Sequence, residues 1–417
     1  MRIIHTSDWH LGQSFYTKSR AREHQAFLDW LVAQVERHQV DAVIVAGDIY
    51  DTGTPPSYAR ELFNHFVVAL QALQPTGCEL IVMAGNHDAV ATLNESRSLL
   101  ACMHTRVIAG VGVTNGVDNP VMVLNQRNGK PGAILCAIPF LRPRDMLLSH
   151  AGQSAPDKQR ALVDAIAGHY QTLYQQALNL RAQLPGSLPI IATGHLTTVG
   201  ASTTDSVRDI YIGSLEAFPA QLFPPADYIA LGHIHRPQCV AGQEHIRYCG
   251  APIALSFDEA GQPKQVNLVS FDENNSPDTV PLLVPETQAL RLLKGSLTEI
   301  EASLQAFSHT PPGPPVWLDI EVTTDVYLND IQQQIQRMAA DLPVEIVLLR
   351  RNREQRLMAL TRQHHETLTE LSTADVFERR LALIPQPESE QLDRIRILYQ
   401  QVADDVNSAQ STPGDTH

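Results

Sequence analysis

The stretch Asp41-Ala42-Val43-Ile44-Val45-Ala46, followed by Gly47-Asp48, joins an uninterrupted apolar run to a polar pair at its end. Apolar runs of similar length occupy residues 80–84 and 228–231 and are also bounded by glycine. Continuous rather than alternating apolarity predicts strands that are buried on both faces of a sheet. Segments with helical spacing alternate with these runs and would cover the sheet: 26–38, 58–73 and 159–182. The sequence therefore predicts a layered α/β fold.

Polar motifs follow the ends of the apolar runs. They are Asp8-Trp9-His10, Gly47-Asp48, Gly85-Asn86-His87-Asp88, Gly194-His195 and Gly232-His233-Ile234-His235. Ligands bind at the carboxyl ends of strands in open α/β sheets, so we expect these motifs to converge. A pair of divalent cations roughly 3.5 to 4 Å apart needs a bridging carboxylate and several further ligands. Mixed oxygen and nitrogen donors suit Mn²⁺, Fe²⁺ or Zn²⁺, so the set predicts a two-metal phosphoesterase site with manganese as first choice.

The motifs differ in how strongly they indicate a metal site. Asp8 and His10 alone are weak evidence, because either residue could cap a helix or satisfy a turn. The tetrapeptide Gly85-Asn86-His87-Asp88 is more specific, since three polar side chains after a strand are costly to bury without purpose. In His233-Ile234-His235 the two imidazoles project to the same face of an extended segment. The ordered set is therefore much stronger evidence than any one motif.

Several residues near the motifs are candidates for supporting roles. Asp51 could orient a ligand imidazole, cap a helix or face solvent. Asp88 is expected to fix the ring of His87. His5 falls within the first predicted strand and is expected to be a core residue. We interpret the other histidines outside the motifs as surface or structural residues.

Composition limits the classes of protein to which the chain can belong. Its 417 residues are enough for two or three domains, and no apolar stretch approaches the roughly 20 residues of a membrane span. The first residues run directly into a metal motif, so we expect no signal peptide and a cytoplasmic location. The five cysteines are scattered and form no Cys-x-x-Cys pair, which argues against a disulfide framework and a thiolate zinc site.

The net charge of −14 makes the chain a poor DNA binder by itself, because such proteins usually present a basic face. Two divalent cations would, however, return about four positive charges where a phosphate docks. The net charge therefore argues against a nucleic-acid-binding function without excluding it.

The pattern of elements predicts four regions along the chain. The first domain spans 1–275 and ends after a strand over 266–271. A small α/β domain over 276–350 has predicted strands at 289–293, 316–322 and 344–349, with helices at 297–307 and 326–340. Residues 351–406 have helical spacing with narrow apolar stripes, which is typical of helices that lie on another surface. Residues 407–417 are expected to be a disordered tail.

The ordered motif set resembles the calcineurin-like metallophosphoesterase superfamily and, within it, the double-strand-break repair nucleases. Residues 5–12, 47–53 and 248–257 carry the closer resemblance, which extends through nearly the whole chain. It implies a metallophosphoesterase β-sandwich flanked by helices, a capping domain over 276–350, and partner-binding helices over 351–406.

The resemblance also implies roles for individual residues. One metal would be held by Asp8, His10, Asp48 and His235, and the other by Asp48, Asn86, His195 and His233, with Asp48 as the bridge. His87 would stabilise the charged transition state or protonate the leaving oxygen. Archaeal and eukaryotic relatives place a histidine where this chain has Asp51, so the role of that histidine does not transfer, and the bacterial branch fits better.

The activity implied is that of the nuclease subunit of an ATP-dependent complex that acts in DNA replication, recombination and repair. Its expected reactions are double-strand exonuclease cleavage, with 3′–5′ polarity, and single-strand endonuclease cleavage that opens hairpins. Expected partners are an SMC-like ATPase, DNA ends and hairpins, and a second copy of the chain bound through helices at 58–73 and 92–103. The alternatives are a small-molecule phosphodiesterase or phosphatase with the same metal core, and a non-catalytic scaffold.

Overall fold

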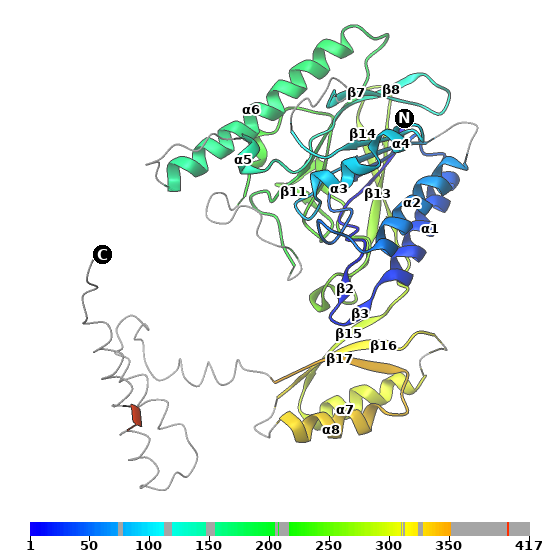
Figure 1. The fold of residues 1–417 in the computed structure, drawn as a ribbon, viewed down its shortest axis with the longest axis vertical. Helices are drawn as coiled ribbons and strands as arrows, with labels where there is room; N and C mark the ends of the chain where they lie inside the picture. Colours follow the sequence, from blue (N-terminus) through cyan, green and yellow to red (C-terminus); the bar gives the residue numbers. More distant parts are fainter. Residues whose placement is uncertain are drawn as a thin grey trace, which may run out of the picture. The chain divides into compact units, whose positions relative to one another are not determined.

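The computed structural model describes residues 1–73, 78–111, 119–146, 155–204, 207, 217–309, 311, 313–323, 328–351 and 398–399 (Figure 1). The chain divides into two compact units, Met1–Arg351 and Asn352–His417. The helical region predicted over 351–406 lies almost entirely outside the described residues, and the predicted tail over 407–417 lies wholly outside them. Within the described part, no helix is both long and apolar enough to cross a membrane.

The first sheet has six strands in the order β14-β13-β1-β4-β5-β6. Its strands are β1 (Arg2–Thr6), β4 (Ala42–Ala46), β5 (Glu79–Met83), β6 (Thr105–Ile108), β13 (Gln265–Phe271) and β14 (Pro277–Leu283). Strands β1, β4, β5 and β6 run parallel, while β13 pairs antiparallel with both β1 and β14. The carboxyl ends of β1, β4 and β5 therefore lie at the same edge of this sheet.

The second sheet also has six strands, in the order β11-β12-β10-β9-β8-β7. Its strands are β7 (Val121–Asn125), β8 (Pro131–Cys136), β9 (Ile190–His195), β10 (Tyr228–Gly232), β11 (Gln238–Val240) and β12 (Gln243–Tyr248). Strands β8, β9, β10 and β12 are parallel, and the two outer strands are antiparallel to their neighbours. The ends of β9 and β10 are consequently adjacent.

Alternating side chains along the strands fill two different cores. On β4, Val43 and Val45 belong to a core that also contains residues of α1 (Ala21–Arg37) and α2 (Ser57–Gln71), whereas Ile44 belongs to a core shared with the second sheet. This period of two is expected of a strand that is buried on both faces. The two sheets therefore pack face to face, and the two helices cover the first of them (Figure 1).

Helix α6 (Ala155–Arg181) covers the outer face of the second sheet through residues such as Ile166 and Tyr170. The resulting order of layers is helix, sheet, sheet, helix. The layered α/β fold predicted from the sequence is confirmed. Shorter elements complete this part: β2 (Ser14–Phe15), β3 (Lys18–Ser19), α3 (Val90–Glu95), α4 (Arg97–Ala101), α5 (Pro143–Met146), η1 (Ala220–Leu222) and η2 (Phe257–Glu259).

A third, three-stranded parallel sheet has its own core. It consists of β15 (Leu290–Gly295), β16 (Val316–Val322) and β17 (Val344–Arg351), connected by α7 (Leu297–Gln305), η3 (Ala306–His309) and α8 (Leu328–Ala339). Helix α7 begins with a capping box in which Ser296 and Glu299 satisfy each other's backbone N–H groups. These elements match the strands and helices predicted here from the sequence.

The other face of the small sheet packs against the first part of the chain. Trp317 and Leu290 form a cluster with Phe15 and Phe257, and the ring of Phe15 stacks on Trp317 with centroids 5.7 Å apart. The guanidinium of Arg20 lies 5.0 Å from the Phe15 ring centroid. Packing of aromatic side chains therefore holds the small sheet against the hairpin β2-β3.

One strand differs from the sequence-based organisation. Strand β14 falls after the predicted boundary at residue 275, yet it pairs with β13 over seven residues as the edge of the first sheet. Pro277 and Pro281 make this strand hard to recognise from the sequence, because proline lacks the N–H that a central strand needs. Proline is tolerated in an edge strand. The exact boundary between the two domains remains a prediction.

Candidate metal centre

The predicted ligands come together at the carboxyl ends of five strands, β1, β4, β5, β9 and β10. Two groups of predicted ligands have possible ligand atoms that lie within 4.8 Å of one another: Asp8, His10 and His235; and Asp48, His195 and His233. A third such group joins His10 and Asp48 to His87, which is not among the predicted ligands. Residues separated by more than 200 positions thus share one site. The convergence follows from the parallel strands, which place their loops at a common edge.

Asp48 lies in the middle of these groups and is almost completely buried. Its Oδ2 atom is 3.2 Å from Nε2 of His195 and 3.6 Å from Nε2 of His10. Its Oδ1 atom accepts a hydrogen bond of 2.9 Å from the backbone N–H of His87. A carboxylate that faces imidazoles on both sides has the geometry required of a bridging ligand.

Asn86 faces the side of the centre that contains His195 and His233. Its Oδ1 atom lies 2.9 Å from Nε2 of His195 and 3.2 Å from Nδ1 of His233. The backbone carbonyl of Ala46 accepts from Nδ1 of His195 at 2.9 Å, which directs Nε2 of that ring toward Asp48 and Asn86. This half of the site is thus oriented by contacts from both sheets.

Asp8, His10 and His235 make up the other side. Asp8 is fully buried, and its Oδ1 atom accepts from the backbone N–H of His233 at 2.9 Å. The rings of His10 and His235 have centroids 5.2 Å apart. The two halves of the centre are therefore joined through Asp48 and through the backbone of His233.

Four of the predicted ligands have backbone conformations that residues other than glycine rarely adopt. The φ angles are +54° at Asp8, +46° at His10, +52° at Asp48 and +94° at His233. Such left-handed conformations cost on the order of 1–3 kcal/mol each and persist where the surrounding structure enforces them. Here the N–H groups of Asp8 and His10 donate to the carbonyls of Gly47, at 3.0 Å, and Asp48, at 3.1 Å. Such strain is concentrated at functional sites in proteins.

Two glycines leave room for the ligands. A Cβ atom on Gly85 would overlap the carboxylate of Asp48, and one on Gly47 would overlap the ring of His195. Gly47 also has a φ angle of +98°, which favours glycine for a second reason. The Gly-Asp and Gly-Asn pairs of the sequence thus have a steric basis.

The charges of the centre are strongly coupled. Burial raises the pKa of Asp48, but His195 and His10 more than offset it, so that pKa lies well below its ordinary range. Burial lowers the pKa of His195, but the Asp48 carboxylate outweighs burial and raises it to about 9. For His233, burial and the nearby His195 lower the pKa well below its usual value, so its imidazole is neutral.

The side chains fit a divalent metal in their chemistry as well as their position. The Nε2 atom of His10, which faces Asp48, is buried without a hydrogen-bond partner in the described structure. Unpartnered buried nitrogen atoms are costly, and a metal ion would satisfy them. The set combines carboxylate, amide and imidazole donors, which suits a transition metal better than Ca²⁺ or Mg²⁺.

His87 lies beside the ligands, with its ring centroid 4.6 Å from that of His10. Its Nδ1 atom is 2.7 Å from the carbonyl oxygen of Asp51, and the carboxylate of Asp51 lies 3.2 Å from Nδ1 of His10. Of the alternatives for Asp51, the geometry favours orientation of a ligand imidazole.

Asp88 has a different structural role from the one expected. Its carboxylate accepts from the backbone N–H groups of Ile49 at 3.1 Å, Tyr50 at 3.0 Å and Gly85 at 2.9 Å. It therefore fixes the loops after β4 and β5, while the ring of His87 is held by the backbone of Asp51. The expectation that Asp88 fixes this ring is corrected accordingly.

His5 is a fully buried core residue as predicted, with Nδ1 3.0 Å from the hydroxyl of Tyr228. Glu259 was not predicted, although its Oε1 atom lies 3.6 Å from Nδ1 of His235. No spacing rule links positions 235 and 259, so only the fold reveals this contact.

Comparison with known proteins gives the family of the chain. The calcineurin-like phosphoesterase family matches residues 1–237, and the type 5 capsule protein repressor C-terminal domain family matches residues 286–384. The SbcD component of the SbcCD nuclease of Escherichia coli (strain K12) is 59% identical over 96% of this chain and 97% of the relative. The SbcD proteins of Bacillus subtilis (strain 168) and Rhodobacter capsulatus are 33% and 31% identical, over 77% and 83% of this chain and 79% and 86% of theirs. The chain therefore belongs to the calcineurin-like phosphoesterases and, among them, to the family of SbcD nucleases.

Proposed function

We propose that this chain is the nuclease subunit of an SbcCD-type complex and hydrolyses DNA phosphodiester bonds. The observation that carries this conclusion is the convergence of a complete set of metal ligands in a chain similar to the SbcD nuclease over nearly its whole length. Its reactions are exonuclease cleavage of double-stranded ends, with 3′–5′ polarity, and endonuclease cleavage that opens hairpins. They serve DNA replication, recombination and repair.

The centre is proposed to hold two divalent ions, with Mn²⁺ as the preferred metal. Asp8, His10 and His235 would hold one ion, Asn86, His195 and His233 the other, and Asp48 would bridge them. When bound, such a pair supplies a hydroxide nucleophile at neutral pH and polarises the phosphoryl oxygens. The mixed nitrogen and oxygen donors support the choice of metal.

His87 is proposed to be the catalytic residue that is not a ligand. Because Nδ1 faces the carbonyl oxygen of Asp51, this atom carries the ring proton in the neutral imidazole, and Nε2 is directed elsewhere. A proton on Nε2 would then stabilise the charged phosphoryl group or pass to the leaving oxygen. Asp51 would thus hold His87 through its carbonyl and His10 through its carboxylate.

A partner ATPase is proposed to bind through residues 351–406. The names of the relatives describe one component of a nuclease called SbcCD, and the SbcC component is expected to be an SMC-like ATPase. Because this chain has a net charge of −14, much of the affinity for DNA would come from the partner. The small α/β domain would act as a cap that admits and orients DNA.

Self-association is proposed through helices of the phosphoesterase domain. On α2, the side chain of Val68 is 55% exposed, and on α4 that of Leu99 is 65% exposed. Exposed apolar side chains on helices are suited to burial between two copies of a chain. A cytoplasmic location is also proposed, which is compatible with the five free cysteines.

Cleavage of a hairpin-ended duplex in Mn²⁺, with and without the ATPase partner and ATP, tests this function. A generic phosphodiester such as bis-p-nitrophenyl phosphate serves as the comparison substrate. We expect the hairpin to be opened and the response to ATP to show whether the partner controls access. Hydrolysis of the small diester without cleavage of any DNA would instead favour a small-molecule phosphodiesterase.

A further inference from the structure

Glu259 is a fully buried carboxylate behind His235, at the end of the turn η2. Its oxygens accept from the hydroxyl of Thr204 at 3.0 Å, the hydroxyl of Ser256 at 3.1 Å and the N–H of Leu255 at 3.2 Å. A buried carboxylate is costly unless it is paired and hydrogen-bonded, and these contacts meet that requirement. Its position is therefore fixed independently of any metal ion.

Lys264 pairs with this carboxylate and is itself only 8% exposed. Its ammonium also donates to the carbonyl oxygen of His235 at 3.4 Å. Since Oε1 of Glu259 lies 3.6 Å from Nδ1 of His235, the two members of the ion pair contact the ring and the backbone of the same residue. The ion pair therefore contacts His235 at both its ring and its backbone carbonyl.

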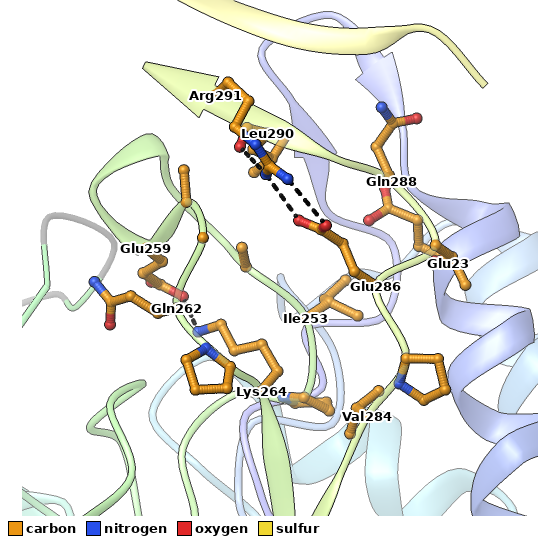
Figure 2. Close-up of a pocket in the computed structure, with 17 residues that line it drawn as sticks. Glu23, Ile253, Glu259, Gln262, Lys264, Val284, Glu286, Gln288, Leu290 and Arg291 are labelled. Carbon is orange, nitrogen blue, oxygen red and sulfur yellow. Dashed lines mark hydrogen bonds and ion pairs between the residues drawn. The ribbon is translucent and has the colours of Figure 1, made fainter. Parts of the chain in front are cut away.

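The ion pair also forms part of the wall of a cavity of about 250 Å³, where Glu259 and Lys264 face each other (Figure 2). Other charged groups around this cavity have partners of their own. Arg291 lies 3.2 Å from Glu286, and Glu23 pairs with Arg20. The charges of the cavity thus neutralise one another, and the distinctive neighbour of the Glu259–Lys264 pair is His235.

Other imidazoles of the centre show what such a contact does. Nδ1 of His10 faces the carboxylate of Asp51 at 3.2 Å, and Nδ1 of His195 faces the carbonyl of Ala46 at 2.9 Å. Histidines that bind metals almost always donate the second ring N–H to a carboxylate or carbonyl, which fixes the tautomer and the orientation of the ring. At His235, the group in this position is Glu259.

We propose that Glu259, held by Lys264, is a positioning residue that keeps the proton of His235 on Nδ1 and directs the lone pair of Nε2 toward Asp8 and His10. The inference deepens the proposed function, because it concerns the same metal centre. It assigns to a residue outside the predicted ligand set the task of preparing one half of that centre.

The test replaces the pair by neutral residues of similar shape, Glu259→Gln together with Lys264→Met. The double substitution is needed because Glu259→Gln alone would leave a buried ammonium without its carboxylate and could prevent folding. In an Mn²⁺ titration of the full chain followed by electron paramagnetic resonance, we expect one of two sites to weaken by about 10–100-fold. The other site, with His195 and Asn86, should keep its affinity.

A matched control is Asp319→Asn in the small sheet. Asp319 is also a fully buried carboxylate, and it is paired with Arg350 rather than with a residue of the metal centre. This variant should lose stability without a change in either Mn²⁺ affinity. Wild-type affinity at both sites in the double variant would overturn the positioning role. If the wild-type chain itself bound no Mn²⁺, the proposed function would fail instead.

Nitrogen-15 chemical shifts of the His235 ring in the metal-free chain give a second readout that a purely structural role would not change. We expect the wild type to show a protonated Nδ1 and an unprotonated Nε2, and the double variant to show a mixture of tautomers. The same single tautomer in both proteins would contradict the proposal.

Discussion

At the scale of single residues, His87 contacts the predicted ligands without belonging to them. We expect His87→Gln to keep nearly all of the bound metal while turnover falls by about 10²–10⁴-fold, because the change removes a transition-state contact and no ligand. Metal analysis by mass spectrometry together with single-turnover cleavage measures both effects. Loss of both metal ions from the variant would show that His87 has been assigned the wrong role.

His24 gives a prediction about stability rather than activity. It is fully buried on α1, and burial, with a smaller effect of Arg20, lowers the pKa of its imidazole to about 3. The unfolded chain therefore binds the proton at higher pH than the folded chain, so stability falls as pH drops from about 6.5 toward 3. His24→Leu should remove this dependence. On going from pH 8 to pH 5, the free energy of unfolding of the wild type should fall by about 2 kcal/mol more than that of the variant.

Chemical unfolding of the metal-free proteins at several pH values measures this difference. His65→Leu, which replaces an exposed histidine on α2, is the matched control. Parallel curves for the wild type and the His24 variant would contradict the prediction.

Residues of the metal centre were predictable where a polar motif directly follows a strand. Asp8, Asp48, Asn86 and His195 are of this kind, because the strand direction alone determines where such side chains meet. Glu259 was not predictable, since it reaches His235 through a turn that has no recognisable spacing. The role of Asp88 was missed for a related reason: its partners are backbone N–H groups, which every sequence contains.

At the scale of elements, the loop after β4 needs glycine at position 47 to leave room for the ring of His195. We expect Gly47→Ala to weaken Mn²⁺ binding by at least about tenfold, because the added methyl group would displace the ring of His195. Gly186→Ala separates this effect from backbone strain. Gly186 also has a positive φ, +82°, but no atom lies within 4 Å of the position of its added Cβ atom.

Calorimetric titration of both glycine variants with Mn²⁺ gives the comparison. Both should lose some stability from the left-handed backbone, but only the Gly47 variant should lose metal affinity. An equal effect in the two variants would mean that the steric contact with His195 is unimportant.

The elements themselves were predicted unevenly. Strands β4 and β10 were readable because they are fully apolar and end at glycine. Strand β12 was not, since its mixed sequence Gln243–Tyr248 is buried at only some positions. Strand β14 was hidden by its prolines, which only an edge position tolerates. Tertiary context, rather than local pattern, determines these last two strands.

At the scale of the whole molecule, the chain divides after Arg351 into two compact units, and we propose that catalysis belongs to the first and partner binding to the second. A chain that ends at Arg351 retains the compact first unit and every predicted ligand. We expect it to hydrolyse a small phosphodiester at nearly the wild-type rate but to lose association with the ATPase partner. Co-purification with that partner measures the second effect, and a complex that survives the truncation would place the docking surface elsewhere.

The proposed homodimer would bury the exposed apolar side chains of α2 and α4. Leu99→Glu would place a charge in an interface formed by α2 and α4, so we expect a monomer by light scattering. Leu283 on β14 is 62% exposed, close to the 65% of Leu99, and provides the control Leu283→Glu. A dimer disrupted only by the Leu283 variant would move the interface to the edge of the first sheet.

DNA cleavage by the proposed metal centre should depend on Asp48, the residue common to both halves of that centre. The most direct measurement compares cleavage of a hairpin-ended duplex in Mn²⁺ by the wild-type chain and by Asp48→Asn. We predict that the wild type opens the hairpin, that chelation of the metal abolishes the reaction, and that the variant is inactive although folded. Cleavage of the hairpin by Asp48→Asn at the wild-type rate would show that this metal centre does not cleave DNA.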